Sequence, residues 1–419
     1  MRRDGRTTVG AISVQTDWPY LTADLPGIGG RVKSCVEDFR VDEIPLYAAC
    51  GEGTHVYVQI RKAGIPTPVA VERIARYMNT RPSEIGVAGL KDAQAVATQW
   101  LSLEHADPDA LAGYRDGQMQ VLTVTRHTNK LRPGHLEGNR FAIRIRNVGG
   151  SALPAAEAVL ETLTRRGVGN YFGHQRFGMR MDTHLLGAAL VRDDLDEFLA
   201  LYLGRPAPDD PPDCRGAREA FDAGDLEGAL KHWPRHYGNE RRALSAFKRR
   251  HKATAAVAAV DKRMRRLFVS ACQSAIFNDV VAARIDTIDR VFVGDLAKKT
   301  DTGGVFSVED VEVDQPRADA LQISPTGPIV GTRCDLAEGR PGEIERRAID
   351  ASGLTLELFT KVGRLKLKGA RRPLRFLLGD PSATAGRDDR GEFVELRFTA
   401  PSGCYATVAV REITKTGAL

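Results

Sequence analysis

The sequence predicts an α+β fold, in which a mixed or antiparallel sheet carries helices on one face and is interrupted by a long, largely helical segment. Strand-like and helix-like segments alternate through the first third of the chain, helix-like segments dominate from about residue 183 to 284, and β-rich runs return near the C-terminus. The chain has 419 residues, which exceeds what one hydrophobic core usually organises. We therefore expect either two domains or one domain with a large insertion.

The first third of the chain carries the clearest strand and helix patterns. Val56, Val58 and Ile60 share one face at period two, which predicts a half-buried strand over residues 54–60. Apolar residues at helical spacing follow over 67–79, where a Thr-Pro pair provides a favourable helix start. The same criteria predict strands at about 118–126 and 140–148 and a helix at about 154–166.

The middle of the chain is predicted to be helical, with one loop at 205–214 that contains four prolines. Short strands and turns return at about 289–306, and another helix is expected at about 342–350. Two β-rich runs, at 374–378 and 393–412, are predicted to close the chain.

The composition is that of an ordinary folded protein, with 42% hydrophobic and 27% charged residues. No run of about 20 apolar residues could cross a bilayer, and no apolar signal region follows residues 1–5, so we expect a cytoplasmic protein. The six cysteines form no C-x-x-C pair, which argues against a disulfide framework and against a zinc site. The net charge of +6 is compatible with a polyanionic partner but does not demand one.

Residues 87–92 (VAGLKD) are typical of a short strand that enters a turn and displays the charged pair Lys91 and Asp92. Loops that follow strands commonly present catalytic side chains. An aspartate in such a turn is nevertheless most often a hydrogen-bonding turn former or a helix cap. The interpretation of Asp92 therefore depends on the other motifs of the chain.

Several motifs, in a fixed order, resemble those of the TruD family of tRNA pseudouridine synthases. Residues 89–92 are similar to the family's G-x-K-D, and residues 33–43 (KSCVEDFRVDE) resemble K-x-x-P-E-D-F-x-V-x-E, with Val36 in place of the proline. Further similar segments are 130–141 (KLRPGHLEGNRF), 170–178 (NYFGHQRFG), 270–278 (SACQSAIFN) and 401–412 (PSGCYATVAVRE). The matches run in family order from about residue 25 to 413, whereas G-x-K-D alone would carry little weight.

The resemblance implies an isomerase that converts a uridine of tRNA, uridine 13 of the D arm, to pseudouridine, although some relatives act on other RNAs. The reaction breaks the bond between uracil N1 and ribose C1′, turns the base and joins C5 to C1′, so it requires no cofactor and no metal. The family's catalytic aspartate corresponds to Asp92, which either adds to the sugar carbon or removes a ribose proton. Lys33 matches the motif lysine and is our candidate to keep Asp92 charged, because a nearby cation favours the ionised carboxylate.

The family's uridine pocket corresponds to four residues of this chain: Phe39, Asn139, Phe141 and Tyr405. Residues two apart on a strand share a face, so Asn139 and Phe141 are expected to point into the same pocket. An amide can bond a uracil edge, and an aromatic face can stack on a base for roughly 1–3 kcal/mol. The alternative for each aromatic residue is ordinary core packing. Tyr405 is expected just before the final strand and has a hydroxyl where some relatives carry phenylalanine.

The remaining candidates concern RNA contacts. His174 and Arg176 could contact phosphate or the active-site loop, although their Gly-flanked aromatic segment could equally serve as a packing hinge. Basic clusters at 241–242, 248–252, 262–266 and 361–375 predict salt-sensitive affinity for RNA phosphates. No single Lys or Arg is assigned to a phosphate, because a charged run is usually a solvated face.

The resemblance implies a pseudouridine synthase domain formed by residues 1–178 and 373–419, interrupted by a TRUD insertion domain over 179–372. Two other classes of protein compete with this interpretation. A non-catalytic RNA-binding protein is disfavoured by the presence of Asp92, Asn139 and the aromatic set. An RNA methyltransferase would need a glycine-rich strand-to-helix turn followed by an acidic ribose-binding residue, and the sequence offers none in a suitable context. We expect tRNA as the partner, with no membrane and no obligatory protein partner.

Overall fold

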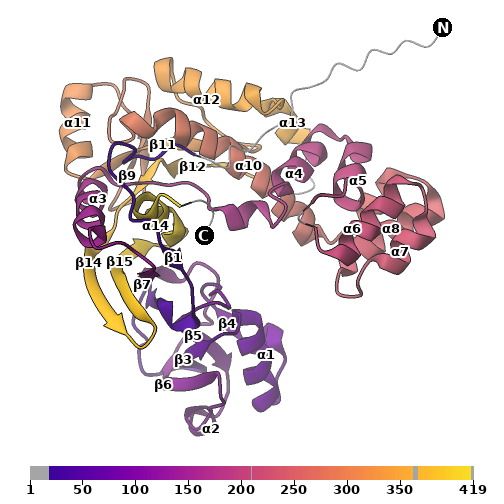
Figure 1. Ribbon diagram of the computed structural model, residues 1–419, viewed down its shortest axis with the longest axis horizontal. Helices are drawn as coiled ribbons and strands as arrows, with labels where there is room; N and C mark the ends of the chain where they lie inside the picture. The colour runs from indigo at the N-terminus through magenta and orange to yellow at the C-terminus, as the bar shows by residue number, and fades with distance from the viewer. Residues whose placement is uncertain (1–17, 209, 362–366, 417–419) are drawn as a thin grey trace. The chain divides into compact units, whose positions relative to one another are not determined.

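The computed structural model describes residues 18–208, 210–361 and 367–416 (Figure 1). By its internal contacts the chain divides into two compact units. The sheet unit comprises Tyr20–Val168 and Phe376–Leu419, and the helical unit comprises Met1–Pro19 and Gly169–Arg375. Two of the sequence predictions, on residues 1–5 and on part of the basic run 361–375, fall outside the described residues. Within the described ranges, no helix is long and apolar enough to cross a membrane.

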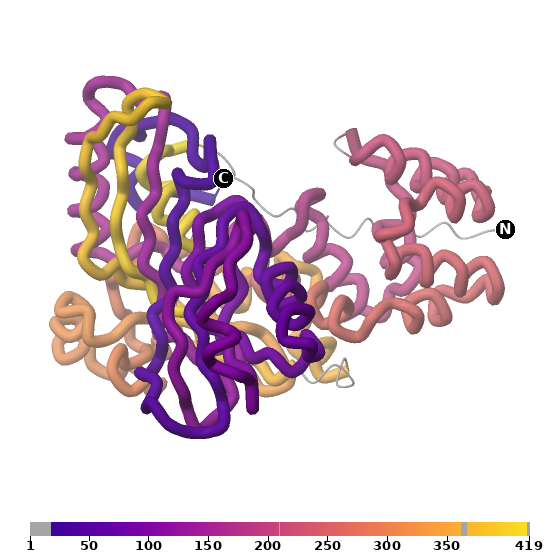
Figure 2. The backbone as a smooth tube through the Cα atoms, turned by 90° about the horizontal axis from the view of Figure 1, so that it is seen from below, coloured from indigo at the N-terminus to yellow at the C-terminus, as the bar shows by residue number. Residues whose placement is uncertain are grey.

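The sheet unit is built on a nine-stranded sheet, in which the order is β14-β15-β7-β2-β5-β3-β6, with β1 paired to β7 and β4 paired to β5. The pairs are antiparallel apart from β2 and β5, which run parallel. In Figure 2 the β14–β15 hairpin, in yellow, runs alongside β7. The strands are β1 (Arg31–Val32), β2 (Phe39–Pro45), β3 (His55–Ala63), β4 (Gly86–Val87), β5 (Val96–Glu104), β6 (Met119–His127), β7 (Leu136–Arg146), β14 (Gly379–Asp388) and β15 (Gly391–Pro401).

Helices complete the sheet unit, and the result confirms the predicted α+β class. They are α1 (Thr67–Tyr77), α2 (Pro108–Ala112), α3 (Ala152–Arg166) and α14 (Ala406–Thr414), together with the short 3-10 helices η1 (Val36–Asp38) and η2 (Pro82–Glu84). The period-two face of Val56, Val58 and Ile60 is fully buried and packs against Ala70 and Ile74 of α1. The other elements predicted in the first third are also present, although β7 begins four residues earlier than expected.

The predicted β-rich run over 393–412 is wrong in its second half. Strand β15 ends at Pro401, the chain turns at Gly403 with a φ of +81°, and α14 follows. The β-branched residues of this segment suggested a strand. In the structure eight of the nine residues of α14 are buried, so this helix lacks the one-sided burial pattern by which a surface helix is recognised. Tyr405 therefore precedes a helix rather than the final strand.

Two further expectations about element bounds need correction. The run 374–378 contains only the two-residue strand β13 (Arg375–Phe376), and the strand β14 beyond it was not predicted, because its sequence GDPSATAGRD is poor in strand-forming residues. The proline-rich loop ends earlier than expected, since helix α6 begins at Pro212. Proline is tolerated in the first turn of a helix, where its missing N–H has no intrahelical partner.

The helical unit contains most of the helices and a four-stranded sheet of order β10-β9-β11-β12. Its strands are β8 (Val168–Gly169), which begins at the unit boundary, β9 (Leu296–Lys299), β10 (Val305–Ser307), β11 (Ile323–Ile329) and β12 (Ala370–Pro373). Its helices are η3 (His174–Phe177), α4 (Thr183–Arg192), α5 (Leu195–Leu203), α6 (Pro212–Asp222), α7 (Leu226–His232), α8 (Gly238–Arg250), α9 (Ala253–Ala259), α10 (Lys262–Arg284), η4 (Ile285–Thr287), α11 (Val311–Asp319), α12 (Gly339–Ala351) and α13 (Leu356–Lys361).

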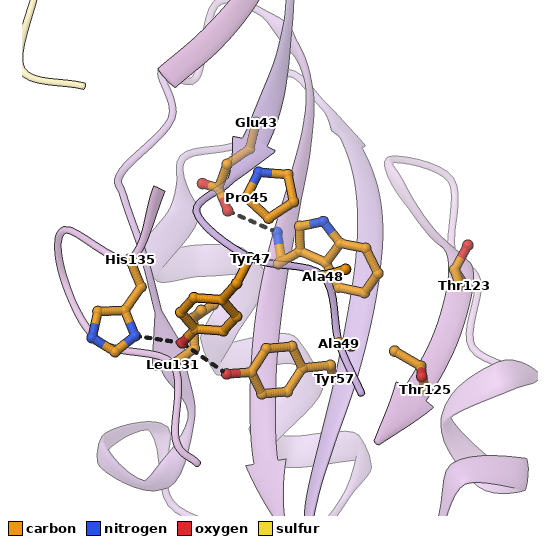
Figure 3. A pocket seen from close by; sticks show the side chains of 11 residues that line it. Glu43, Pro45, Tyr47, Ala48, Ala49, Tyr57, Thr123, Thr125, Leu131 and His135 are labelled. Atoms are coloured by element: carbon orange, nitrogen blue, oxygen red, sulfur yellow. Dashed lines mark hydrogen bonds between the residues drawn. The ribbon is translucent and has the colours of Figure 1, made fainter. Parts of the chain in front are cut away.

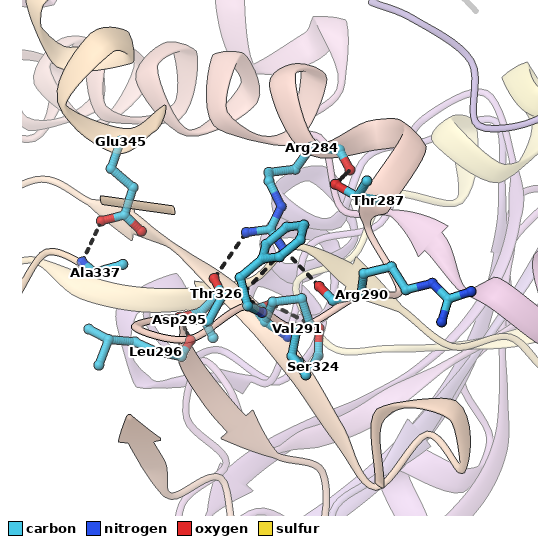
Figure 4. A network of polar contacts seen from close by, with 12 residues as sticks. Arg284, Thr287, Arg290, Val291, Asp295, Leu296, Ser324, Thr326, Ala337 and Glu345 are labelled. Atoms are coloured by element: carbon cyan, nitrogen blue, oxygen red, sulfur yellow. Dashed lines mark hydrogen bonds and ion pairs between the residues drawn. The ribbon is translucent and has the colours of Figure 1, made fainter. Parts of the chain in front are cut away.

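Buried ion pairs join the helices of this unit to its sheet (Figure 4). Arg284, at the end of α10, donates to Asp295 over 3.0 Å and to the Arg290 carbonyl over 2.7 Å. Both charged side chains are almost fully buried. Glu345 of α12 pairs with Arg371 of β12. Because a buried charge that loses its partner is strongly destabilising, these residues serve the fold of the helical unit.

Candidate active site

Asp92 lies on the loop between β4 and β5. The two charged residues of this loop, Lys91 and Asp92, differ in their exposure to solvent. The Lys91 side chain is only 5% exposed, whereas the Asp92 side chain is 46% exposed. The Lys91 backbone N–H donates to Thr67 Oγ1 over 2.8 Å at the start of α1. The buried side of the loop is thus anchored to the start of α1, and the Asp92 carboxylate faces solvent, where a substrate can reach it.

Lys62, which the sequence analysis did not single out, supports this loop. Its ammonium donates to three backbone carbonyls: Ile65 at 2.6 Å, Asp92 at 2.9 Å and Lys91 at 3.3 Å. Burial lowers the pKa of Lys62 to about 8, although the charge of Asp92 acts in the opposite direction. A signal was present in the sequence, since Lys62 continues the period-two face of Val56, Val58 and Ile60, where an apolar residue is expected.

Lys33 and Asp92 come together as predicted, with 3.2 Å between Lys33 Nζ and Asp92 Oδ2. The same ammonium lies 4.6 Å from the centroid of the Phe39 ring. Lys33 is a non-glycine residue with a positive φ of 56°, a conformation that costs energy and that often occurs at functional sites. The pair therefore joins the two motifs K-x-x-x-E-D-F and G-x-K-D.

The aromatic candidates Phe39 and Phe141 also meet, with ring centroids 6.1 Å apart in an edge-on arrangement. Phe141 contacts Phe398 of β15 as well, at 5.4 Å. Both predicted rings are largely buried, so the core packing that was their alternative explanation is present in the structure. Base stacking on either ring stays a prediction.

Asn139 lies on β7 directly opposite Glu43 of β2, and its Oδ1 accepts a hydrogen bond of 2.7 Å from Lys91 Nζ. Side-chain contacts thus link Asn139 to Lys91, and they link Asp92 through Lys33 to Phe39 and from there to Phe141. Tyr405 is the residue that precedes α14, and the strand β15 before it ends opposite Gly138, the neighbour of Asn139. Tyr405 follows that strand end by four residues, and its place in the uridine pocket stays a prediction.

A buried ion pair holds the E-D-F element in place. Asp38 is fully buried and accepts two hydrogen bonds from Arg146 of β7, at 2.7 and 2.8 Å. Burial by itself raises the pKa of Asp38, but the hydrogen bonds from Arg146 and Cys35 outweigh it and the pKa is lowered. Arg146 also donates to Asp388 of β14. The pair therefore fixes the start of β2, where Phe39 lies.

A second buried ion pair was also missed by the sequence analysis. Glu43 is 1% exposed, and its Oε2 lies 3.0 Å from Lys91 Nζ, while its Oε1 accepts the Trp100 backbone N–H over 3.2 Å. Glu43 is the last residue of the motif E-D-F-x-V-x-E, where it shares a strand face with Phe39 and Val41. A carboxylate on an otherwise buried face was the signal that could have identified it.

Glu43 also borders a cavity of about 340 Å³ in the sheet unit (Figure 3). Tyr47, Tyr57 and Trp100 form its aromatic walls, and the Tyr47 hydroxyl lies 2.7 Å from His135 Nδ1. None of the predicted site residues lines this cavity. In the described part of the chain, no group of three or more His, Cys, Asp or Glu side chains could hold a metal ion.

In the helical unit, the contacts of His174 and Arg176 favour the packing interpretation. The His174 ring stacks on Trp18 with centroids 4.8 Å apart, and Arg176 donates to Ser274 of α10 over 3.2 Å. Some residues of the predicted basic clusters are likewise used inside the fold, among them Arg241, Arg371 and Arg375, which donate to backbone carbonyls or pair with Glu345. Exposed cations of these clusters include Arg249 and Arg250 at the end of α8, Lys252 after it, and Lys262, Arg263 and Arg266 of α10.

Known proteins resemble this chain over nearly its whole length. The family model described as tRNA pseudouridine synthase D (TruD) matches residues 15–413. The tRNA pseudouridine synthase D of Geobacter metallireducens is 43% identical over 399 residues, which cover 95% of this chain and 98% of the relative. The protein of the same name from Geobacter sulfurreducens is 43% identical over 400 residues, which cover 95% and 97%.

A solved structure agrees with the sequence relatives. The crystal structure of the putative tRNA pseudouridine synthase D (TruD) from Methanosarcina mazei matches with a TM-score of 0.82 and 28% identity, and the match covers 98% of this chain and 99% of that one. The order of motifs, the fold and these similarities lead to one conclusion: the chain belongs to the tRNA pseudouridine synthase D (TruD) family.

Proposed function

We propose that this protein is a tRNA pseudouridine synthase that isomerises uridine 13 of the D arm without a cofactor, with Asp92 as the catalytic carboxylate. One observation carries the proposal: Asp92 is a half-exposed carboxylate, paired with Lys33, on a loop whose other charged residue, Lys91, is buried against Asn139. This arrangement links a reactive carboxylate on the loop to an amide on β7 through the neighbouring Lys91, and both groups belong to family motifs.

The proposed reaction needs only groups that this site contains. Asp92 either adds to ribose C1′ or removes a ribose proton, and the bond between C1′ and uracil N1 breaks. The detached uracil turns and C5 bonds to C1′; in the first route the bond between Asp92 and C1′ breaks at this step, and in the second route Asp92 returns the proton to the ribose. The proton lost from C5 is balanced by the proton gained at N1. Lys33, whose ammonium lies 3.2 Å from Asp92 Oδ2, orients the carboxylate before the attack. Asn139, with Phe39, Phe141 and Tyr405, holds the base while it turns.

We further propose that residues 179–372 are the TRUD insertion domain and that its exposed cations bind tRNA phosphates. The exposed residues at the end of α8 and the start of α10 support this role, because clustered Lys and Arg side chains attract RNA without reading its sequence. The affinity for tRNA is then expected to fall steeply as the salt concentration rises.

The function is tested with purified protein and an unmodified tRNA transcript, in the presence of a metal chelator and without S-adenosylmethionine. We expect one uridine to be converted to pseudouridine, and a transcript with cytidine at position 13 to remain unmodified. Binding of tRNA without turnover would instead indicate a non-catalytic RNA-binding protein. A requirement for S-adenosylmethionine would indicate a methyltransferase.

The burial of Lys62 predicts a pH dependence of turnover. The folded pKa of about 8 lies below the ordinary value of about 10.4, so between these pH values the unfolded chain binds more protons, and this group makes stability rise with pH. Turnover is expected to fall over the same range, because a neutral amine has two donors for three carbonyls. The basic limb of the kcat profile should therefore show an apparent pKa near 8.

The variant Lys62→Met should lack this basic limb and should lower kcat by about 10-fold or more at pH 7, because the Asp92 loop loses its support. Lys130→Met is the matched control, since among the described residues the Lys130 ammonium donates to a single carbonyl, that of Ser83. A basic limb that persists unchanged in Lys62→Met would assign it to another group.

A further inference from the structure

We propose that Lys91 orients the Asn139 side chain so that its NH₂ group binds the oxygen at C4 of the target uracil and excludes cytosine. The inference rests on the proposed function, because it concerns the base that the same site receives. It assigns Lys91 as a positioning residue and Asn139 as the residue that distinguishes the two pyrimidines.

The orientation of the Asn139 amide follows from the chemistry of its partner. Lys91 Nζ lies 2.7 Å from Asn139 Oδ1. A lysine ammonium has three donors and no acceptor, so only the oxygen of the amide can face it. This removes the usual ambiguity between the nitrogen and oxygen of an asparagine side chain. The NH₂ group of Asn139 must therefore point away from Lys91.

Lys91 itself is held firmly. Its side chain is 5% exposed and pairs with Glu43 at 3.0 Å, and Glu43 is bound in turn by the Trp100 backbone N–H. Reversing the amide would place its NH₂ group against a buried ammonium and leave one Lys91 donor without an acceptor, which costs about as much as a lost buried hydrogen bond. The orientation is thus maintained by a buried charge rather than by a mobile surface group.

The NH₂ group of Asn139 is available to a ligand. Among the described residues it donates no hydrogen bond to another protein group, and it is not enclosed by the protein. Asn139 is partly buried, and Phe141, two residues along β7, shares its strand face. Lys91 joins Asn139 to the loop that carries Asp92, so a base at this face lies within the candidate site.

A donor at this position distinguishes uracil from cytosine at C4. Uracil has an accepting oxygen there, whereas cytosine has a donating amino group. Two donors that face each other both stay unsatisfied, which corresponds to a loss of affinity of about 5- to 100-fold. The oxygen at C2 is common to both bases, so a donor directed at C2 would give no such preference.

The test compares the binding of two tRNA transcripts that differ only in uridine or cytidine at position 13. All proteins carry Asp92→Asn, so that turnover does not remove the substrate. The parent protein should bind the uridine transcript about 5- to 100-fold more tightly. Asn139→Asp retains the oxygen that faces Lys91 but directs an acceptor at the base, so its preference should disappear or reverse.

Two further variants separate positioning from folding. Lys91→Met together with Glu43→Gln removes both buried charges and frees the amide, so the preference should fall towards equal binding although Asn139 is still present. Asn147→Asp, the same chemical change in the exposed turn that follows β7, should leave the preference unchanged.

The inference is overturned if Asn139→Asp keeps the parent's preference for the uridine transcript, or if the parent binds both transcripts equally. These results are distinguishable from a failure of the proposed function. Wild-type protein that makes pseudouridine while Asn139→Asp keeps the preference would refute only the inference. An absence of pseudouridine with a preference that disappears in Asn139→Asp would refute only the function.

Discussion

Asp92→Asn and Asp92→Ala are expected to lower kcat for pseudouridine formation by at least about 1,000-fold, equivalent to about 4 kcal/mol of transition-state stabilisation. Either route requires an ionised carboxylate at this position, and neither an amide nor a methyl group can replace it. The measurement is single-turnover formation of pseudouridine in an unmodified tRNA transcript.

The structure indicates that this loss will be chemical rather than a result of unfolding. The Asp92 side chain is 46% exposed and forms an ion pair with Lys33, so its replacement should change the free energy of unfolding by only about 0.5 kcal/mol. Binding of tRNA should stay close to that of the wild type. Asp42→Asn, an exposed aspartate on β2, is the matched control and should retain activity. Substantial turnover by Asp92→Ala would contradict the proposed mechanism.

Arg146→Met is expected to have the largest effect on stability, lowering the free energy of unfolding by about 3–5 kcal/mol at pH 7. The substitution leaves Asp38, which is fully buried, without the cation that donates to both of its oxygens. Urea denaturation measures the effect. Phe39 follows Asp38 directly, so the variant should also lose activity under conditions in which it is still folded.

The pH dependence of this effect has a defined sign. The folded pKa of Asp38 is lowered, so its stabilising contribution is present above the unfolded value of about 3.9 and is lost as the pH falls through the folded pKa. The wild type and Arg146→Met should therefore converge in stability below about pH 4.

Arg387→Met is the control for this prediction. Arg387 pairs with Glu392 across the β14–β15 hairpin and both side chains are exposed, so its loss should cost less than about 1 kcal/mol. The double variant Asp38→Asn, Arg146→Met should recover part of the loss because no buried charge is left unpaired. A cost for Arg146→Met that does not shrink as the pH falls well below about 4 would show that Asp38 is not its origin.

Local patterns in the sequence were sufficient for several elements and for the main candidate residue. Strand β3, helix α1 and helix α3 were predicted because their apolar residues repeat at a period of two or at helical spacing, which depends only on neighbouring residues. The order of the motifs pointed to the family and to Asp92. It also paired Lys33 with Asp92, two residues that the structure places 3.2 Å apart.

Other features depended on contacts between distant residues, and only the tertiary structure decided them. Lys91 and Asn139 are 48 positions apart, and Asp38 and Arg146 are 108 positions apart, so nothing in the local pattern indicates that they touch. Residues 406–414 could form a strand or a helix by their local preferences, and their packing in the fold, where eight of the nine residues are buried, decided for the helix. The sequence by itself identified Asp92 as the candidate catalytic carboxylate, because a motif is recognised from the identity and spacing of neighbouring residues. The tertiary structure decided which buried charges hold Asp92 and Asn139 in place, because strand pairing and burial bring those charges together.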